Sequence, residues 1–90
     1  MTDPIRTQVL NEAGAIITGD RQADYGDAAD SCALIARLWS AILGHEILPH
    51  EVALCLTQLK IARIAHNPTI RDSWVDGIGY LALGAEIADA

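Results

Sequence analysis

Apolar residues recur along most of this chain at the three- and four-residue spacing that places them on one face of an α-helix. Glycine, proline, aspartate and asparagine divide the pattern into four stretches, and these residues commonly begin or end helices. No stretch alternates between apolar and polar residues as a half-buried β-strand does. The pattern therefore predicts an all-α, four-helix bundle-like domain with helices over residues 4–18, 28–43, 49–65 and 71–88.

Specific residues predict where the second and third helices begin and end. Asp27 can cap the second helix with its carboxylate, and Gly44 is a typical residue after a helix C-terminus. Pro49 suits the first turn of the third helix, where its missing N–H does no harm. Asn67 tolerates the left-handed conformation, and we expect it to end the third helix ahead of Pro68.

The chain has more apolar residues than a domain of 90 residues readily buries. Hydrophobic residues make up 51% of the sequence, whereas a domain of this size buries only about 60–65% of its unfolded surface. The third predicted helix is apolar on nearly all sides, which is typical of a buried helix. Gly77 and Gly84 share one face of the fourth helix and indicate a close helix–helix contact. We therefore expect a homo-oligomer, with this glycine face as a candidate contact between subunits.

Charge and hydropathy argue against several classes of partner. The net charge of −6 argues against binding a nucleic-acid polymer, which requires a basic surface. No apolar run reaches the roughly 20 residues of a membrane span, and the first residues, MTDPIRTQ, do not resemble a signal peptide. Cys32 and Cys55 lie in predicted helices, and we expect both to be reduced. We therefore expect a cytoplasmic protein without a membrane partner.

Four charged residues interrupt the apolar pattern near the junction of the third and fourth helices. Lys60 and Arg63 are three residues apart, and Asp72 and Asp76 are four apart, so each pair shares a helix face. The link between the two helices is about five residues long, which makes the helices antiparallel neighbours. We therefore expect the face with the two cations to meet the face with the two carboxylates.

Two interpretations of these four residues are open. In the first, they form partly buried ion pairs that fix how the two helices pack. In the second, they line a polar pocket, where Lys60 and Arg63 bind the phosphate oxygens of a ligand. Asp72 and Asp76 would then hold a divalent cation such as Mg²⁺ or orient the two cations.

The stretch RQADYG, between the first two helices, offers a second small group of polar and aromatic residues. Arg21 can contact phosphate in the way expected of Lys60 and Arg63. Tyr25 can stack on a nucleobase or pack over the end of the bundle. Such groups are common on any protein surface, so this stretch supports the pocket interpretation only in combination with the other residues.

Several motifs of the chain together resemble those of a known family. They are DYG followed by a helix, then KIAR, then DSWVDGIGYLALGAEI, and they extend over roughly Arg21 to Ile87. The combination resembles a family of small helical proteins of uncharacterised function that phages and prophages encode. The resemblance implies a protein that is made in the cytoplasm of a bacterial host.

More distantly, the chain is similar to the MazG-like all-α nucleoside triphosphate pyrophosphohydrolases and to phage nucleotide-modification-associated proteins. Those relatives have a Tyr–Gly turn, a Lys/Arg helix and a terminal helix in which a Tyr follows an Asp by four residues, a pattern that Asp76 and Tyr80 match. The MazG-like enzymes bind Mg²⁺ through E-x-x-E and E-x-x-D motifs. Here Ser73 stands three residues before Asp76, and Lys60 and Arg63 stand where acids would be expected.

These observations lead to one expected function and two alternatives. We expect the chain to bind a nucleotide or another phosphorylated small molecule without turning it over, as a sponge or a regulator. The first alternative is a Mg²⁺-dependent pyrophosphohydrolase, and the second is a structural or protein-interaction oligomer without a small-molecule ligand. No catalytic residue is assigned, and Asp72 and Asp76 are the candidate metal ligands. The candidate ligand-binding residues are Arg21, Tyr25, Lys60, Arg63, Asp72, Asp76 and Tyr80.

Overall fold

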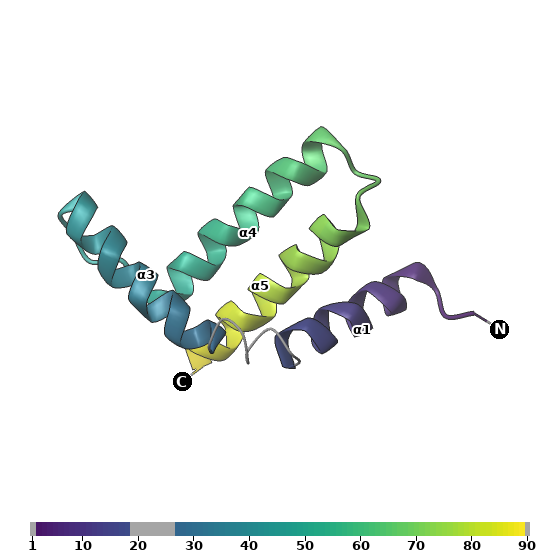
Figure 1. Cartoon of the computed structure of the whole chain (residues 1–90), viewed down its shortest axis with the longest axis horizontal. Helices are drawn as coiled ribbons and strands as arrows, with labels where there is room; N and C mark the ends of the chain where they lie inside the picture. The colour runs from purple at the N-terminus through teal and green to yellow at the C-terminus, as the bar shows by residue number, and fades with distance from the viewer. Residues whose placement is uncertain (1, 19–26, 90) are drawn as a thin grey trace.

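The computed structural model describes residues 2–18 and 27–89, and these ranges contain four α-helices and no β-strand (Figure 1). The helices are α1 (Ile5–Thr18), α3 (Ala28–Leu43), α4 (Pro49–His66) and α5 (Arg71–Asp89). Within these ranges, the predicted all-α class and the four predicted helices are confirmed. The candidate residues Arg21 and Tyr25 lie outside the described residues.

The helices α4 and α5 form an antiparallel hairpin, and the other two helices pack on different parts of it (Figure 1). The helix α1 packs along α5, whereas α3 crosses the first half of α4 near the end of α5. The molecule is elongated, with extents of 52 × 30 × 25 Å. The expected bundle is thus an open arrangement, because α1 and α3 bury their apolar faces against the hairpin and share little contact with each other.

Two separate clusters of buried side chains follow from this arrangement. The larger one lies where α3 meets the hairpin and consists of Cys32, Ala36, Val52, Ala53 and Leu83. The smaller one joins α1 to α5 and consists of Val9, Ala13 and Val75. An exposed ion pair supports the second contact, because Arg71 Nε lies 3.0 Å from Glu12 Oε2.

The capping residues of α3 occupy their predicted positions. Asp27 precedes the helix and accepts a hydrogen bond from the Asp30 N–H at 3.1 Å. Gly44 follows the helix in the left-handed conformation, with φ of 76°, which is accessible to glycine at little cost. Its N–H donates to the carbonyl of Ser40 at 2.9 Å, so the last turn of α3 is closed as predicted.

The end of α4 differs from the prediction. Asn67 has φ of −147° and ψ of 97°, an extended conformation and not the expected left-handed one. The physical reason is Pro68, because the ring of a proline forces the preceding residue into extended backbone. The side chain of Asn67 still shapes the turn, since its Oδ1 accepts hydrogen bonds from the N–H and the hydroxyl of Thr69, at 3.1 and 2.7 Å.

The close helix–helix contact predicted from Gly77 and Gly84 is present, and it lies within the chain. A Cβ added to Gly84 would lie 3.2 Å from the Cβ of Ala53, and one added to Gly77 would lie 3.7 Å from the Cβ of Lys60. Both glycines are buried against α4. The expectation that this face joins two subunits is therefore wrong, because the hairpin itself already covers it.

Within one chain, α4 is buried on its inner side only, and the expectation that a second subunit covers its other side stays a prediction. Val52 and Ala53 are fully buried, but Leu54, Leu59 and Ile61 on the outer side are about half exposed. Several other large apolar side chains on α3 and α5 are exposed to a similar degree.

In the part of the chain that the structure describes, no helix is long and apolar enough to cross a membrane.

Candidate functional site

The four charged residues singled out in the sequence line one groove between α4 and α5, close to the turn that joins the helices. The groove has a volume of about 520 Å³, and we refer to it as the α4–α5 groove. Its lining residues are Lys60, Ala62, Arg63, His66, Asn67, Ile70, Asp72, Ser73 and Asp76. The expectation that the cationic and acidic faces meet across the hairpin is thereby confirmed.

A largely buried ion pair forms the inner wall of the groove. Lys60 Nζ lies 3.0 Å from Asp76 Oδ2, and the two side chains are only 12% and 13% exposed. The stem of Lys60 passes over Gly77, where an added Cβ would lie 3.7 Å from Lys60 Cβ, at ordinary van der Waals distance. The ammonium group of Lys60 contacts the carboxylate of Asp76, the residue that precedes Gly77 in α5.

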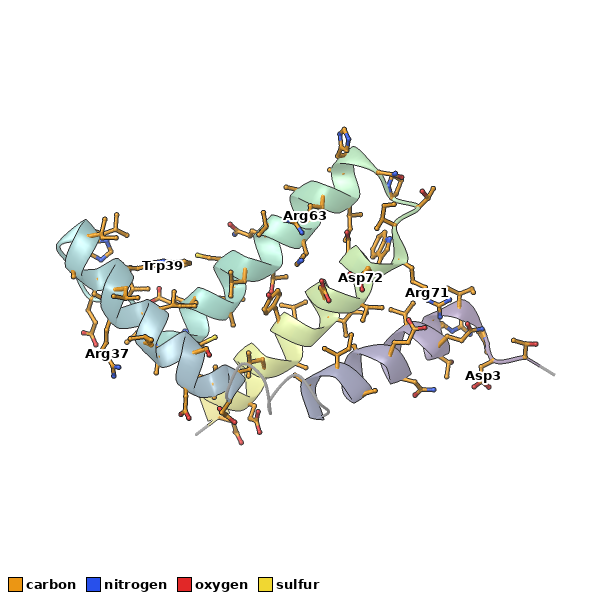
Figure 2. The ribbon with its side chains drawn as sticks, viewed as in Figure 1. Asp3, Arg37, Trp39, Arg63, Arg71 and Asp72 are labelled. Atoms are coloured by element: carbon orange, nitrogen blue, oxygen red, sulfur yellow. The ribbon has the colours of Figure 1, made fainter. Side chains whose placement is uncertain are left out.

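Arg63 and Asp72 have a different environment, although they line the same groove. Both residues are exposed and lie between α4 and α5 (Figure 2). Among the described residues, neither side chain has an opposite charge within 4.0 Å. The packing interpretation therefore accounts for Lys60 and Asp76, whereas Arg63 and Asp72 present a cation and a carboxylate to the open groove.

Five residues that line the groove were not among the sequence-based candidates, and His66 and Ser73 are two of these whose side chains can bind a ligand. His66 occupies the last turn of α4 and continues the three-residue step from Lys60 to Arg63. This spacing was visible in the sequence, but a histidine at a helix C-terminus also suits the helix dipole. Ser73 is a buried residue of α5 that lines the groove four residues before Gly77.

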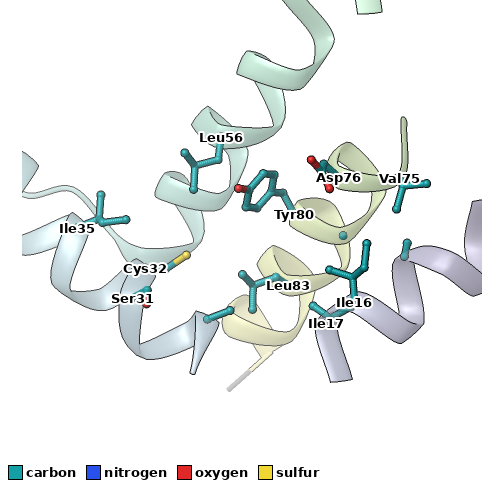
Figure 3. A pocket seen from close by; sticks show the side chains of 13 residues that line it. Ile16, Ile17, Ser31, Cys32, Ile35, Leu56, Val75, Asp76, Tyr80 and Leu83 are labelled. Atoms are coloured by element: carbon teal, nitrogen blue, oxygen red, sulfur yellow. The ribbon is translucent and has the colours of Figure 1, made fainter. Parts of the chain in front are cut away.

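A second, mostly apolar pocket of about 290 Å³ adjoins the groove (Figure 3). We call it the central pocket because all four helices contribute to it. Tyr80 extends from α5 toward Leu56 of α4 and forms one side (Figure 3). Asp76 lines both spaces, and so it marks the place where the apolar pocket meets the charged groove. The full lining is Ala13, Ile16, Ile17, Ala28, Ser31, Cys32, Ile35, Leu56, Val75, Asp76, Gly79, Tyr80 and Leu83.

The two cysteines of the chain are free thiols in different surroundings. Cys32 is buried at the wall of the central pocket, and Cys55 is exposed on α4. Burial raises the pKa of the Cys32 thiol, because it disfavours the charged thiolate. Cys32 is therefore suited to packing and is a poor nucleophile at neutral pH.

The candidate metal ligands Asp72 and Asp76 follow one another on successive turns of α5 and both line the groove. Asp76 uses one carboxylate oxygen for Lys60, whereas Asp72 is exposed. Within residues 2–18 and 27–89, no three His, Cys, Asp or Glu side chains gather closely enough to hold a metal ion. A cation at Asp72 and Asp76 would therefore need water or ligand oxygens to complete its coordination.

Comparison with known proteins identifies the family of the chain. The model of the family described as "Domain of unknown function (DUF6378)" matches residues 8–88. The Gene 55 protein of Mycobacterium phage L5 is 44% identical over 73 residues, which are 80% of this chain and 47% of that protein. The Gene 55 protein of Mycobacterium phage D29 is 38% identical over 72 residues, which are 80% of this chain and 48% of that protein.

The chain thus spans about half the length of the curated relatives that it matches. No solved structure matches it. The resemblance to phage-encoded proteins is confirmed by these relatives, whereas the more distant similarity to MazG-like enzymes stays a prediction. The chain belongs to the DUF6378 family.

Proposed function

We propose that this member of the DUF6378 family binds a nucleotide, or another phosphorylated small molecule, in the α4–α5 groove without turning it over. One observation carries the proposal. Arg63 and Asp72 line a groove that also contains a buried ion pair, yet they are not used for packing. Both side chains line one groove that adjoins the mostly apolar central pocket, so one ligand could contact a cation, a carboxylate and an apolar surface together.

Arg63 is the residue best suited to hold the phosphate. A guanidinium group donates two parallel hydrogen bonds to phosphate oxygens, and its charge is present at any physiological pH. Because Arg63 is exposed and has no acidic partner among the described residues, a phosphate does not have to displace a carboxylate. His66 lines the same groove, where its imidazole ring can make a further hydrogen bond to the ligand.

Asp72 gives the groove a second kind of contact. Its carboxylate would repel a phosphate placed directly against it, but it readily accepts hydrogen bonds from hydroxyl or amino groups. A ligand that carries both phosphate and such donors, as a nucleotide does, matches the two opposite charges of the groove. A bound divalent cation between Asp72 and the phosphate would serve the same purpose.

The central pocket offers a place for the base of a nucleotide. Its volume of about 290 Å³ is at the lower end of the range of roughly 300–1,000 Å³ for ligand pockets. The ring of Tyr80 supplies a flat aromatic surface, and the rest of the lining is largely apolar. Because Asp76 borders both spaces, a ligand can extend from Arg63 in the groove to Tyr80 in the pocket.

Binding without turnover is favoured over pyrophosphohydrolysis by the state of the acidic residues. Hydrolysis of the MazG-like kind needs carboxylates that hold Mg²⁺, but Asp76 is engaged by Lys60 at 3.0 Å. Ser73 occupies the position three residues before Asp76, where those enzymes have an acid. Roles for Arg21 and Tyr25 in the same site stay predictions from the sequence.

A thermal-shift screen tests the proposal directly. The protein is unfolded by heat with nucleoside mono-, di- and triphosphates and with inorganic phosphate, each with and without Mg²⁺. A ligand at 100 times its dissociation constant adds about 2.7 kcal/mol to the free energy of unfolding, which raises the unfolding temperature of a domain of this size by roughly 10–20 °C. We expect such a rise with at least one nucleotide.

The matched variants are Arg63→Met and Arg37→Met. Arg37 is also an exposed arginine in a helix, but it lies on α3, away from the groove (Figure 2). Arg63→Met is expected to remove the shift and Arg37→Met to keep it. If no phosphorylated compound stabilises the wild-type protein, the structural or protein-interaction alternative is the better account. Release of pyrophosphate from a triphosphate that needs Mg²⁺, and that Asp76→Asn abolishes, would instead establish the enzyme.

A further inference from the structure

The helix α3 has two apolar faces, and the described chain covers one of them. On the inner face, Cys32 and Ala36 are buried against the hairpin. On the outer side, a row of apolar residues is exposed to solvent, and we call it the α3 stripe. It consists of Leu34, Leu38, Ala41 and Ile42. Leu34 is 49%, Leu38 55% and Ile42 80% exposed.

The chain as a whole exposes more surface than a compact monomer of its mass, so there is enough area for an interface with a second copy. The chain exposes 6371 Å², whereas a folded monomer of 9.6 kDa exposes about 5,100 Å². The excess of roughly 1,300 Å² is more than the ~800 Å² that each partner loses in a typical stable interface. The radius of gyration of 14.3 Å also exceeds the roughly 12 Å expected of a compact domain of this length.

We infer that the α3 stripe packs against the α3 stripe of a second copy of this chain, antiparallel across a twofold axis near Leu38. The residues of the stripe repeat at steps of four and three, the spacing of the contact seam between paired helices. Leu34 and Ile42 each lie four residues from Leu38. In an antiparallel pair centred on Leu38, Leu34 of one chain therefore meets Ile42 of the other, and the same patch serves both chains.

The contact itself would bring no charged residue of the stripe into an apolar environment, although the net charge opposes self-association at long range. The stripe contains no charged residue, so a second stripe can cover it without burying an unpaired charge. Arg37 points away from the hairpin at the border of the stripe (Figure 2), where it stays in contact with water. Each chain carries a net charge of −6, so the two copies repel one another at long range, and added salt should strengthen the dimer.

The position of α3 keeps this interface apart from the α4–α5 groove. The far half of α3 extends beyond the hairpin, at the end of the molecule opposite the turn between α4 and α5 (Figure 1). A dimer formed there leaves Arg63 and Asp72 open. The inference is therefore independent of the proposed function, and either one can fail without the other.

Light scattering of the purified full chain at high micromolar concentration tests the inference. We expect the wild-type protein to be a dimer with twice the chain mass of 9.6 kDa. We expect Leu38→Glu to be a monomer whose helical circular dichroism is unchanged. Leu81→Glu is the matched control, because Leu81 on α5 is 51% exposed and lies outside the stripe. A monomeric wild-type protein, or dissociation by Leu81→Glu and not by Leu38→Glu, would overturn the inference.

Cross-linking distinguishes the antiparallel pair from other arrangements. In a Cys55→Ser background, a short bifunctional thiol reagent is expected to join two copies of Leu38→Cys, because this position lies near the axis. In Leu34→Cys the two thiols would be about 12 Å apart along the helices, from eight residues of helical rise, and cross-linking should be much weaker. Equal cross-linking at both positions would contradict the antiparallel pairing.

Discussion

At one end of the α4–α5 hairpin, Gly84 brings α5 against Ala53, and seven residues away on both helices Gly77 brings α5 against Lys60. The first contact closes an apolar core, since Ala53 is fully buried and Leu83 nearly so. The second contact holds a buried ion pair and opens into a charged groove. The same small residue at the same helical spacing therefore supports packing at one end and a polar site at the other.

The spacing of the two glycines sets the register of α5 on α4, and the residue that faces each glycine decides whether the contact is apolar or polar. Gly77 faces Lys60 and Gly84 faces Ala53, so the two contacts are seven residues apart on both helices. Few other registers of α5 on α4 would keep both contacts. With that register set, Lys60 is placed next to Asp76, and Arg63 one turn further along lies over the open groove.

The largest effect is expected for Lys60→Met. The change leaves the carboxylate of Asp76, which is 13% exposed, without its partner, and removal of one member of a buried pair costs about 3–5 kcal/mol. We expect a loss of that size in the free energy of unfolding measured with urea. The double variant Lys60→Met/Asp76→Leu should regain most of it, because it replaces the pair with apolar side chains. A double variant as unstable as Lys60→Met would contradict this account of the pair.

Substitution of the two glycines by alanine should give opposite results. Gly77→Ala places its Cβ 3.7 Å from Lys60 Cβ, an ordinary contact, so the better helix propensity should raise stability by about 0.5–1 kcal/mol. Gly84→Ala places its Cβ 3.2 Å from Ala53 Cβ, and backbone shifts would cost about 1–3 kcal/mol. We expect Gly84→Ala to be the less stable of the two in urea unfolding. If Gly84→Ala were instead the more stable variant, the contact between Gly84 and Ala53 would be less tightly packed than the contact between Gly77 and Lys60.

A smaller effect is expected away from the hairpin contact. The pair of Arg71 and Glu12 joins α1 to α5 at 3.0 Å, but its side chains are 39% and 49% exposed. Such pairs contribute at most about 1 kcal/mol. Glu12→Gln should therefore lower the free energy of unfolding by less than a third of the loss seen with Lys60→Met. A loss of similar size would mean that burial does not distinguish the two ion pairs.

Much of the fold could be predicted because its signals are local. Asp27 and Gly44 mark the ends of α3 through their own backbone and side-chain chemistry, and no long-range contact is needed to interpret them. The open arrangement of the helices could not be predicted, because a helical pattern shows which face is apolar and does not show which partner covers it. The left-handed conformation expected of Asn67 is not adopted, because the steric effect of Pro68 outweighs the tolerance of asparagine for that conformation.

The candidate site was predictable to a similar degree. The short turn between α4 and α5 was sufficient to bring Lys60, Arg63, Asp72 and Asp76 into one groove. Which carboxylate pairs with which cation depends on the register between the helices, and that is set by the facing residues at Gly77 and Gly84. The central pocket could not be found from the sequence, since it depends on how α1 and α3 lean on the hairpin.

The central claim is that the turn end of the hairpin binds a phosphorylated ligand through Arg63 and that Lys60 and Asp76 only hold the groove in shape. Calorimetric titration of the nucleotide that gives the largest thermal shift, into wild-type protein and Arg63→Met, tests it most directly. We predict saturable binding to the wild-type protein and at least a tenfold weaker affinity for Arg63→Met. Because Arg63 is exposed, the variant without ligand should unfold at the same temperature as the wild type. Equal affinity of the two proteins, or heat changes no larger than dilution for the wild type, would contradict the claim.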